Sequence, residues 1–162
     1  MVAAKHTKEE IFELLSQIVD PEIPAVTIEE IGMLQDVNIT ETGCEVIITP
    51  TYTGCPAMGI IEADIKALLD EHGIEAKVKL VYDPAWTTDM ITDVAKEKMR
   101  KYGIAPPVNS SCGNITVAER EIECPQCGSQ NTEVVSRFGS TACKALYKCN
   151  DCKEPFEYFK CH

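Results

Sequence analysis

Cys124-Pro125-Gln126-Cys127 is the stretch that decides the fold of the C-terminal part of the chain. A second pair with the same spacing follows it, Cys149-Asn150-Asp151-Cys152. Two residues separate the cysteines of each pair, so both sulfurs of a pair can point at one ion. Two such pairs supply four thiolates, the tetrahedral ligand set of a structural zinc site. We therefore predict that Cys124, Cys127, Cys149 and Cys152 bind Zn²⁺ and staple a small zinc ribbon.

The residues around the two pairs suit such a ribbon. The pairs are separated by 21 residues, enough for strands that fold back on each other. Short β-like segments lie at 121–123, 133–137, 145–148 and 155–159, and so small a unit needs a staple. Four protein ligands leave no open position, which indicates a structural metal. Iron also binds four thiolates and stays an alternative to zinc. The cysteines could also be unrelated free thiols, whereas disulfides would need an oxidising compartment.

Upstream of the ribbon, the apolar pattern predicts a small α/β domain over residues 1–105. Helices are expected from a Thr7/Glu10 capping box, over 56–72 and over 88–102, with strands near 37–39, 44–48 and 76–82. A strand, a helix and a strand in that order favour a right-handed crossover onto one mixed sheet. The predicted class is α+β: this domain, a linker over 106–119 rich in turn-forming residues, and a β-rich ribbon over 120–162.

A second group of interest is the loop Thr51-Tyr52-Thr53-Gly54-Cys55-Pro56. Pro56 suits the first position of a helix, which would put Cys55 at the N-cap, where the helix dipole lowers a thiol pKa. A thiolate there can bind a metal or a cluster, and Asp20 and Glu22 could lie at the same edge of the sheet. The simpler alternatives are a buried Cys55 that fills the helix start and an Asp20-Pro21-Glu22 that only stops a helix.

The charge and the amino-acid composition of the chain exclude several classes of function. The net charge is −11, and the first 119 residues carry the excess, with 20 acidic and 9 basic side chains. An acidic surface repels phosphate, which argues against nucleic acid as a partner. No apolar run is long enough to span a membrane and no secretory signal is present, so we expect a cytoplasmic protein. Nine cysteines in a reducing compartment favour metal binding or thiol chemistry.

The other notable side chains have simpler interpretations. Trp86 is expected to be a packing anchor, and Cys44 to face the core. The ribbon aromatics are expected to pack around the metal or to form a docking surface: Phe138, Tyr147, Phe156, Tyr158 and Phe159. Cys112 falls in the linker, and Cys143, Cys161 and His162 are spare near the ribbon. Phosphate-loop, dinucleotide and zinc-protease motifs are missing, and no nucleophile–base pair can be assigned, so catalysis is not expected.

Three segments of the first half resemble the family of small iron–sulfur assembly proteins that includes SufT. They are Asp20-Pro21-Glu22-Ile23-Pro24, Thr53-Gly54-Cys55-Pro56 and Tyr82-Asp83-Pro84-Ala85-Trp86-Thr87-Thr88-Asp89-Met90. In the second half, residues 138–149 and 154–160 are similar to the PaaD family, which is associated with phenylacetyl-CoA epoxidase in aerobic phenylacetate breakdown. Together these resemblances span essentially the whole chain.

The resemblance implies a non-catalytic accessory protein that assembles or maintains the iron–sulfur cluster of a multicomponent phenylacetyl-CoA epoxidase. It implies that Cys55 is a transient cluster ligand, with Asp20 and Glu22 as the matching acidic loop. The implied partners are the epoxidase components, especially the [2Fe–2S] reductase, and iron–sulfur assembly proteins. Because one thiolate cannot hold a cluster that takes four ligands, a second copy of the chain or the client would complete the site.

Three other functions stay open from the sequence. The first is a structural or regulatory subunit that docks on the oxygenase without handling clusters. The second is a zinc-ribbon nucleic-acid binder, against which the acidic first half counts. The third is a thiol enzyme that uses Cys55, which would require an activated thiolate.

Overall fold

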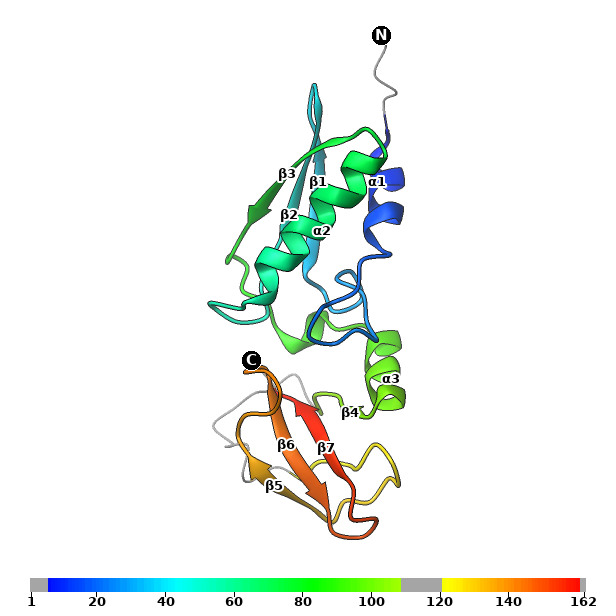
Figure 1. Ribbon diagram of the computed structural model, residues 1–162, viewed down its shortest axis with the longest axis vertical. Helices are drawn as coiled ribbons and strands as arrows, with labels where there is room; N and C mark the ends of the chain where they lie inside the picture. The colour runs from blue at the N-terminus through cyan, green and yellow to red at the C-terminus, as the bar shows by residue number, and fades with distance from the viewer. Residues whose placement is uncertain (1–5, 109–120, 161–162) are drawn as a thin grey trace. The chain divides into compact units, whose positions relative to one another are not determined.

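The computed structural model describes residues 6–108 and 121–160. The chain forms two compact units, Met1–Trp86 and Thr87–His162 (Figure 1). This division falls before the domain boundary expected at residue 105, so the third helix belongs to the second unit. Most of the expected linker lies outside the described residues, as do Cys112, Cys161 and His162.

The first unit is a three-stranded sheet with two helices. Its elements are α1 (Lys8–Leu15), β1 (Leu34–Ile39), β2 (Gly43–Ile48), α2 (Ala57–Glu71) and β3 (Glu75–Leu80). The strand order is β1-β2-β3, with β1 antiparallel and β3 parallel to β2. The three strands, the helical crossover and the mixed sheet that the sequence predicts are therefore present.

The core of this unit lies between the helices and one face of the sheet (Figure 1). Alternate residues of β2 are buried, Cys44, Val46 and Ile48, as the period of a half-buried strand requires. They share the interior with residues of α2 that recur at helical spacing: Ile61, Ile65 and Leu69. The capping box of α1 also forms, with Glu10 N–H donating to Thr7 Oγ1 at 3.2 Å and Thr7 N–H donating to Glu10 Oε2 at 2.9 Å.

Two close contacts constrain the packing of this unit. Gly43 opens β2 where β3 passes so closely that a Cβ atom there would lie 1.9 Å from the Glu75 carbonyl oxygen, so only glycine fits. Trp86, 5% exposed, donates its indole N–H to the Ile31 carbonyl oxygen at 2.9 Å. The expectation that Trp86 is a packing anchor is confirmed.

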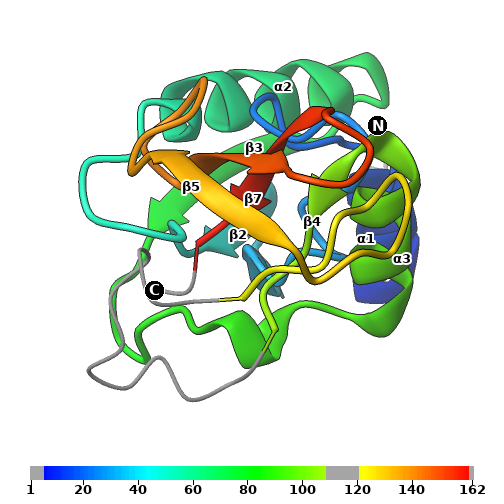
Figure 2. The ribbon, with the colours of Figure 1, turned by 90° about the horizontal axis from the view of Figure 1, so that it is seen from below.

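The second unit is a four-stranded sheet preceded by a helix. Its elements are η1 (Thr88–Met90), α3 (Asp93–Tyr102), β4 (Ile104–Ala105), β5 (Thr132–Ser136), β6 (Lys144–Cys149) and β7 (Pro155–Phe159). The strand order is β4-β7-β6-β5, and Figures 1 and 2 show β5, β6 and β7 in yellow to red. Because β4 pairs in parallel with β7, the chain after α3 is part of this sheet.

The sequence expectations for this unit are mostly met. Three of the four expected β-like segments are strands, whereas residues 121–123 form none. In α3, Ala95 and Met99 are buried, whereas Val94 is 59% exposed. The α+β class with a C-terminal cysteine-rich ribbon is confirmed. Within the described residues, no helix combines the length and the apolar character needed to cross a membrane.

Candidate metal centre and the Cys55 loop

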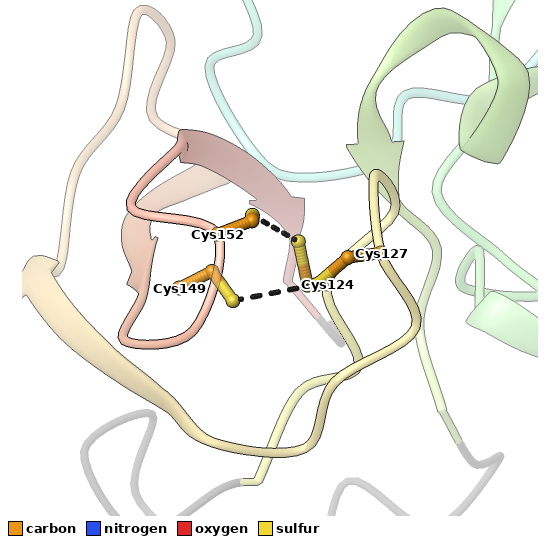
Figure 3. Close-up of side chains that lie close together, drawn as sticks. All are labelled: Cys124, Cys127, Cys149 and Cys152. Atoms are coloured by element: carbon orange, nitrogen blue, oxygen red, sulfur yellow. Dashed lines mark hydrogen bonds between the residues drawn. The ribbon is translucent and has the colours of Figure 1, made fainter.

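The four ribbon cysteines come together in space. Cys124 and Cys127 lie in the loop before β5, whereas Cys149 ends β6 and Cys152 lies in the turn before β7 (Figure 3). The Cys124 and Cys152 sulfurs are 3.7 Å apart, and those of Cys127 and Cys149 are 3.6 Å apart. All four sulfurs lie within 4.8 Å of one another.

These distances fit a single tetrahedral ion. Sulfurs about 2.3 Å from a central zinc form a tetrahedron with edges of about 3.8 Å. A disulfide would bring two sulfurs to about 2.0 Å, and the described cysteines are all unbridged. The donor set and its spacing therefore suit a thiolate-bound metal and not a pair of covalent bridges.

The backbone builds the two halves of the centre in the same way. In the first loop, Cys124 N–H donates to the Ser129 carbonyl and Gly128 N–H to the Cys124 carbonyl, both at 2.9 Å. In the second, Cys149 N–H donates to the Glu154 carbonyl and Lys153 N–H to the Cys149 carbonyl, both at 3.0 Å. We call these loops, residues 124–129 and 149–154, the two knuckles. Each closes the same turn around its pair of sulfurs.

The residue after each cysteine pair has a left-handed backbone, with φ of 74° at Gly128 and 69° at Lys153. Because nothing lies within 4 Å of a Cβ built on Gly128, the cost of Gly128→Ala comes from φ alone. We expect that variant to lower the stability of the metal-loaded ribbon by about 1 kcal/mol. Lys153→Gly is the matched control and should not destabilise it. Calorimetric melting of the loaded variants measures both, and an unchanged melting temperature in Gly128→Ala would contradict the expectation.

The pKa values of the ribbon thiols differ from one another when no ion is bound. Hydrogen bonds from the Cys152 and Asp151 backbone N–H groups lower the pKa of Cys149 to about 7, aided by neighbouring thiols. At Cys152 a bond from Glu154 N–H favours the thiolate, but desolvation and the other three thiols raise the pKa to about 12. Four thiolates this close repel one another, so a bound cation is needed to ionise the whole set.

An aromatic cluster packs beside the metal centre. Cys124 and Cys149 are buried with Tyr147, Phe156 and Tyr158. The Tyr147 and Phe156 rings stack with centroids 5.8 Å apart, and the Tyr147 and Tyr158 rings meet edge to face at 5.7 Å. Packing, the first use expected for these rings, is therefore their role. Phe138 differs: it is 65% exposed, with the Lys160 ammonium 4.4 Å from its ring centroid.

Cys55 lies in the loop before α2, but not at the N-cap. Pro56 occupies the N-cap and Ala57 is the first helical residue. The Cys55 backbone N–H donates to the Tyr52 carbonyl at 3.3 Å, which turns the loop toward the helix. The cysteine is 8% exposed.

The expectation of a lowered Cys55 pKa is wrong. Burial removes water from the sulfur and raises its pKa above the ordinary value, and the Glu22 and Asp20 carboxylates raise it further. Hydrogen bonds from the Ala57 backbone N–H and the Tyr52 side chain act in the opposite direction but do not prevail. The thiol is therefore neutral near pH 7, so its surroundings do not supply the activated thiolate that a thiol enzyme needs.

The two acidic residues do lie close enough to Cys55 to act on its charge. Asp20 is 4% exposed, and its Oδ1 accepts 2.8 Å hydrogen bonds from the Glu22 and Ile23 backbone N–H groups. It therefore holds the loop that carries Glu22, which is half-buried. Loops from two parts of the chain thus bring one thiol and two carboxylates to the start of α2.

Sequence reasoning missed the polar side chains that join the two knuckles. Asp151 accepts from the Ser129 hydroxyl and, at 3.0 Å, from the Asn131 side-chain amide. Such residues follow no spacing rule, and only their position beside both cysteine pairs could have drawn attention to them. Cys143 is buried outside the metal centre, with its sulfur 3.0 Å from the Thr141 hydroxyl.

Two different family models match the two halves of the chain. Residues 8–80 match the model of the iron-sulfur cluster assembly protein family, and residues 110–160 match that of the PaaD zinc beta ribbon domain. The chain is also similar to a solved domain of unknown function, DUF59, from Bacillus anthracis. The two share 28% identity with a TM-score of 0.53, over 57% of this chain and 90% of that one.

Three curated relatives match this chain to different extents. "Fe-S protein maturation auxiliary factor YitW" of Bacillus subtilis is 38% identical over 55% of this chain and 89% of its own. "Fe-S protein maturation auxiliary factor SufT" of Staphylococcus aureus is 34% identical over 49% of this chain and 92% of its own. The D component of the "Putative 1,2-phenylacetyl-CoA epoxidase" of Escherichia coli is 48% identical over 94% of this chain and 92% of its own. The chain therefore belongs to the family of this epoxidase component, PaaD.

Proposed function

We propose that this protein is a non-catalytic accessory protein that assembles or maintains the iron–sulfur cluster of a multicomponent phenylacetyl-CoA epoxidase. One observation carries the proposal: within the segment that matches the assembly-protein family, the Asp20 and Glu22 carboxylates lie close enough to Cys55 to act on the charge of its thiol. Two relatives that match about half of the chain are named as iron–sulfur maturation factors, and the relative that matches 94% of it is named as an epoxidase subunit.

In this proposal Cys55 is a transient ligand for the cluster, which is cargo and not a resident cofactor. Its raised pKa keeps the thiol protonated and unreactive until iron arrives. An iron atom of the cluster then displaces the thiol proton, which passes to solvent, and a sulfur–iron bond forms. The Asp20 and Glu22 carboxylates favour a cationic iron species at this place. One ligand holds a cluster weakly, which suits delivery to a client.

The ribbon has a separate, structural role in this proposal. Cys124, Cys127, Cys149 and Cys152 would hold one Zn²⁺ ion, because their sulfur spacing suits a tetrahedral site. Four thiolates fill the coordination sphere, so this metal supplies folding free energy and no chemistry. The proposed partners are the epoxidase components, especially the [2Fe–2S] reductase, and iron–sulfur assembly proteins.

We expect Cys55→Ser to leave the fold intact and to lower the [2Fe–2S] content of the reductase several-fold when the proteins are produced together. A serine hydroxyl is nearly isosteric with the thiol but is a poor ligand for iron. Iron and acid-labile sulfide per reductase chain measure the effect. Cys44→Ser is the matched control, since Cys44 is another buried cysteine of the same unit whose pKa is also raised by desolvation. Equal reductase occupancy in the Cys55→Ser and wild-type strains would refute the role of Cys55.

The burial of Cys55 favours a second candidate, a structural or regulatory subunit that docks on the oxygenase without handling clusters. The two candidates differ in one result. Stable co-purification with the oxygenase, together with full reductase occupancy in Cys55→Ser, supports the docking role.

A further inference from the structure

A network of polar residues joins the two knuckles, and none of its hydrogen bonds involves a cysteine sulfur. Both residues inside the second cysteine pair, Asn150 and Asp151, bond to residues just after the first pair. Asp151 accepts from the Ser129 hydroxyl and from the Asn131 side-chain amide, the latter at 3.0 Å. Asn150 donates its backbone N–H to the Asn131 carbonyl at 2.8 Å and its amide N–H to Asn131 Oδ1 at 3.3 Å.

Asn131 and Ser129 are themselves fixed to each other. The Asn131 backbone N–H donates to the Ser129 hydroxyl oxygen at 3.0 Å, and the Ser129 carbonyl accepts from Cys124 N–H. The hydroxyl thus accepts one hydrogen bond while it donates another to Asp151. A continuous chain of hydrogen bonds therefore runs from a ligand of the first pair to the interior of the second pair.

We propose that Asp151 is a positioning residue that latches the second knuckle onto the first and thereby slows release of the ribbon metal. It touches no sulfur in this role. Its ionised carboxylate makes charge-assisted hydrogen bonds, which are stronger than neutral ones. Holding the two sulfur pairs at their binding distance lowers the cost of reorganising them around an ion. This inference rests on the metal role proposed for the ribbon above.

Only the second cysteine pair encloses residues that can make these hydrogen bonds. At the equivalent place in the first knuckle the interior residues are Pro125 and Gln126. Proline has no backbone N–H to offer, and glutamine carries no charge. The second knuckle therefore supplies the carboxylate, and Ser129 of the first knuckle and the nearby Asn131 supply the donors.

The test follows metal release from the full chain. Protein loaded with Zn²⁺ is mixed with excess 4-(2-pyridylazo)resorcinol, and the colour of the zinc–dye complex gives the release rate. We expect Asp151→Ala to release zinc about ten-fold faster than wild type, as outer-shell changes at metal sites typically do. Asp151→Asn, which retains one acceptor oxygen, should be intermediate.

Two controls separate the latch from general effects. Glu133→Ala removes the same charge from an exposed position on β5 and should release zinc at the wild-type rate. Ser129→Ala alone should also speed zinc release. In the double variant, the increase in release rate should be smaller than the two single increases multiplied together, because both residues belong to one network. The thiolate–cobalt absorption of Co²⁺-loaded variants should keep the wild-type position, which shows an unchanged ligand set.

The outcomes are distinct. Wild-type release from Asp151→Ala, a rate equal to that of Glu133→Ala, or additive effects with Ser129→Ala would each overturn the latch. If Asp151→Ala does not fold, Ser129→Ala and Asn131→Ala decide the question by the same assay. A wild-type chain that binds neither Zn²⁺ nor Co²⁺ through four thiolates would instead refute the metal role of the ribbon.

Discussion

Replacing Cys124 by serine is expected to unfold the ribbon and to leave the first unit folded. Cys124 is buried beside the aromatic cluster and supplies one of four convergent sulfurs. Zinc binding contributes roughly 10–16 kcal/mol of folding free energy in zinc-finger peptides, far more than a ribbon core of this size can supply. Loss of one ligand therefore removes the main source of ribbon stability.

Amide hydrogen exchange resolves the two units in this variant. Strands β5, β6 and β7 should lose protection, while β1, β2 and β3 keep it. Trp86 is the single tryptophan of the chain and lies in the first unit, so its fluorescence should not change. Cys143→Ser is the matched control within the ribbon unit, because Cys143 lies outside the metal centre. Full protection of the ribbon strands in a metal-free Cys124→Ser protein would contradict the expectation.

The second large effect is expected at Trp86. Truncating this buried side chain to alanine leaves a cavity and an unpaired Ile31 carbonyl, so Trp86→Ala should lower the free energy of unfolding of the first unit by about 3–5 kcal/mol. Trp86→Phe retains most of the apolar volume and loses the hydrogen bond. We expect it to cost about 1–3 kcal/mol.

Urea unfolding followed by circular dichroism at 222 nm measures both variants, since neither contains the tryptophan fluorophore. The signal comes chiefly from the helices, and a separate transition of the second unit is fitted independently. Wild-type stability in Trp86→Ala would show that the indole does not anchor the loop of Ile31.

The ribbon could be predicted from the sequence because the residues that form each half of its metal centre lie close together in the chain. Two cysteines separated by two residues form a turn whose sulfurs converge, and the structure brings the four predicted ligands within 4.8 Å of one another. The same holds for the capping box of α1 and for the buried alternation in β2. In each case the decisive residues are neighbours in the chain or recur with the period of one element.

Cys55 shows where this reasoning fails. The Cys-Pro pair correctly located the start of α2, but the thiol pKa depends on burial and on the carboxylates of a distant loop. Tertiary packing, and not the helix dipole, sets the sign of the shift. The pairing of β4 with β7 likewise depends on residues far apart in the sequence, and it joins the chain after α3 to the ribbon sheet.

The central claim is that a structural ion, held by four ribbon thiolates, is separate from a labile cluster that depends on Cys55. Metal and acid-labile sulfide analysis of anaerobically purified protein, wild type beside Cys55→Ser, tests this separation most directly. We predict equal zinc, one ion per chain, in both proteins, and iron with sulfide in the wild type alone. A wild-type chain without ribbon metal, or the same iron and sulfide content in both proteins, would contradict the claim.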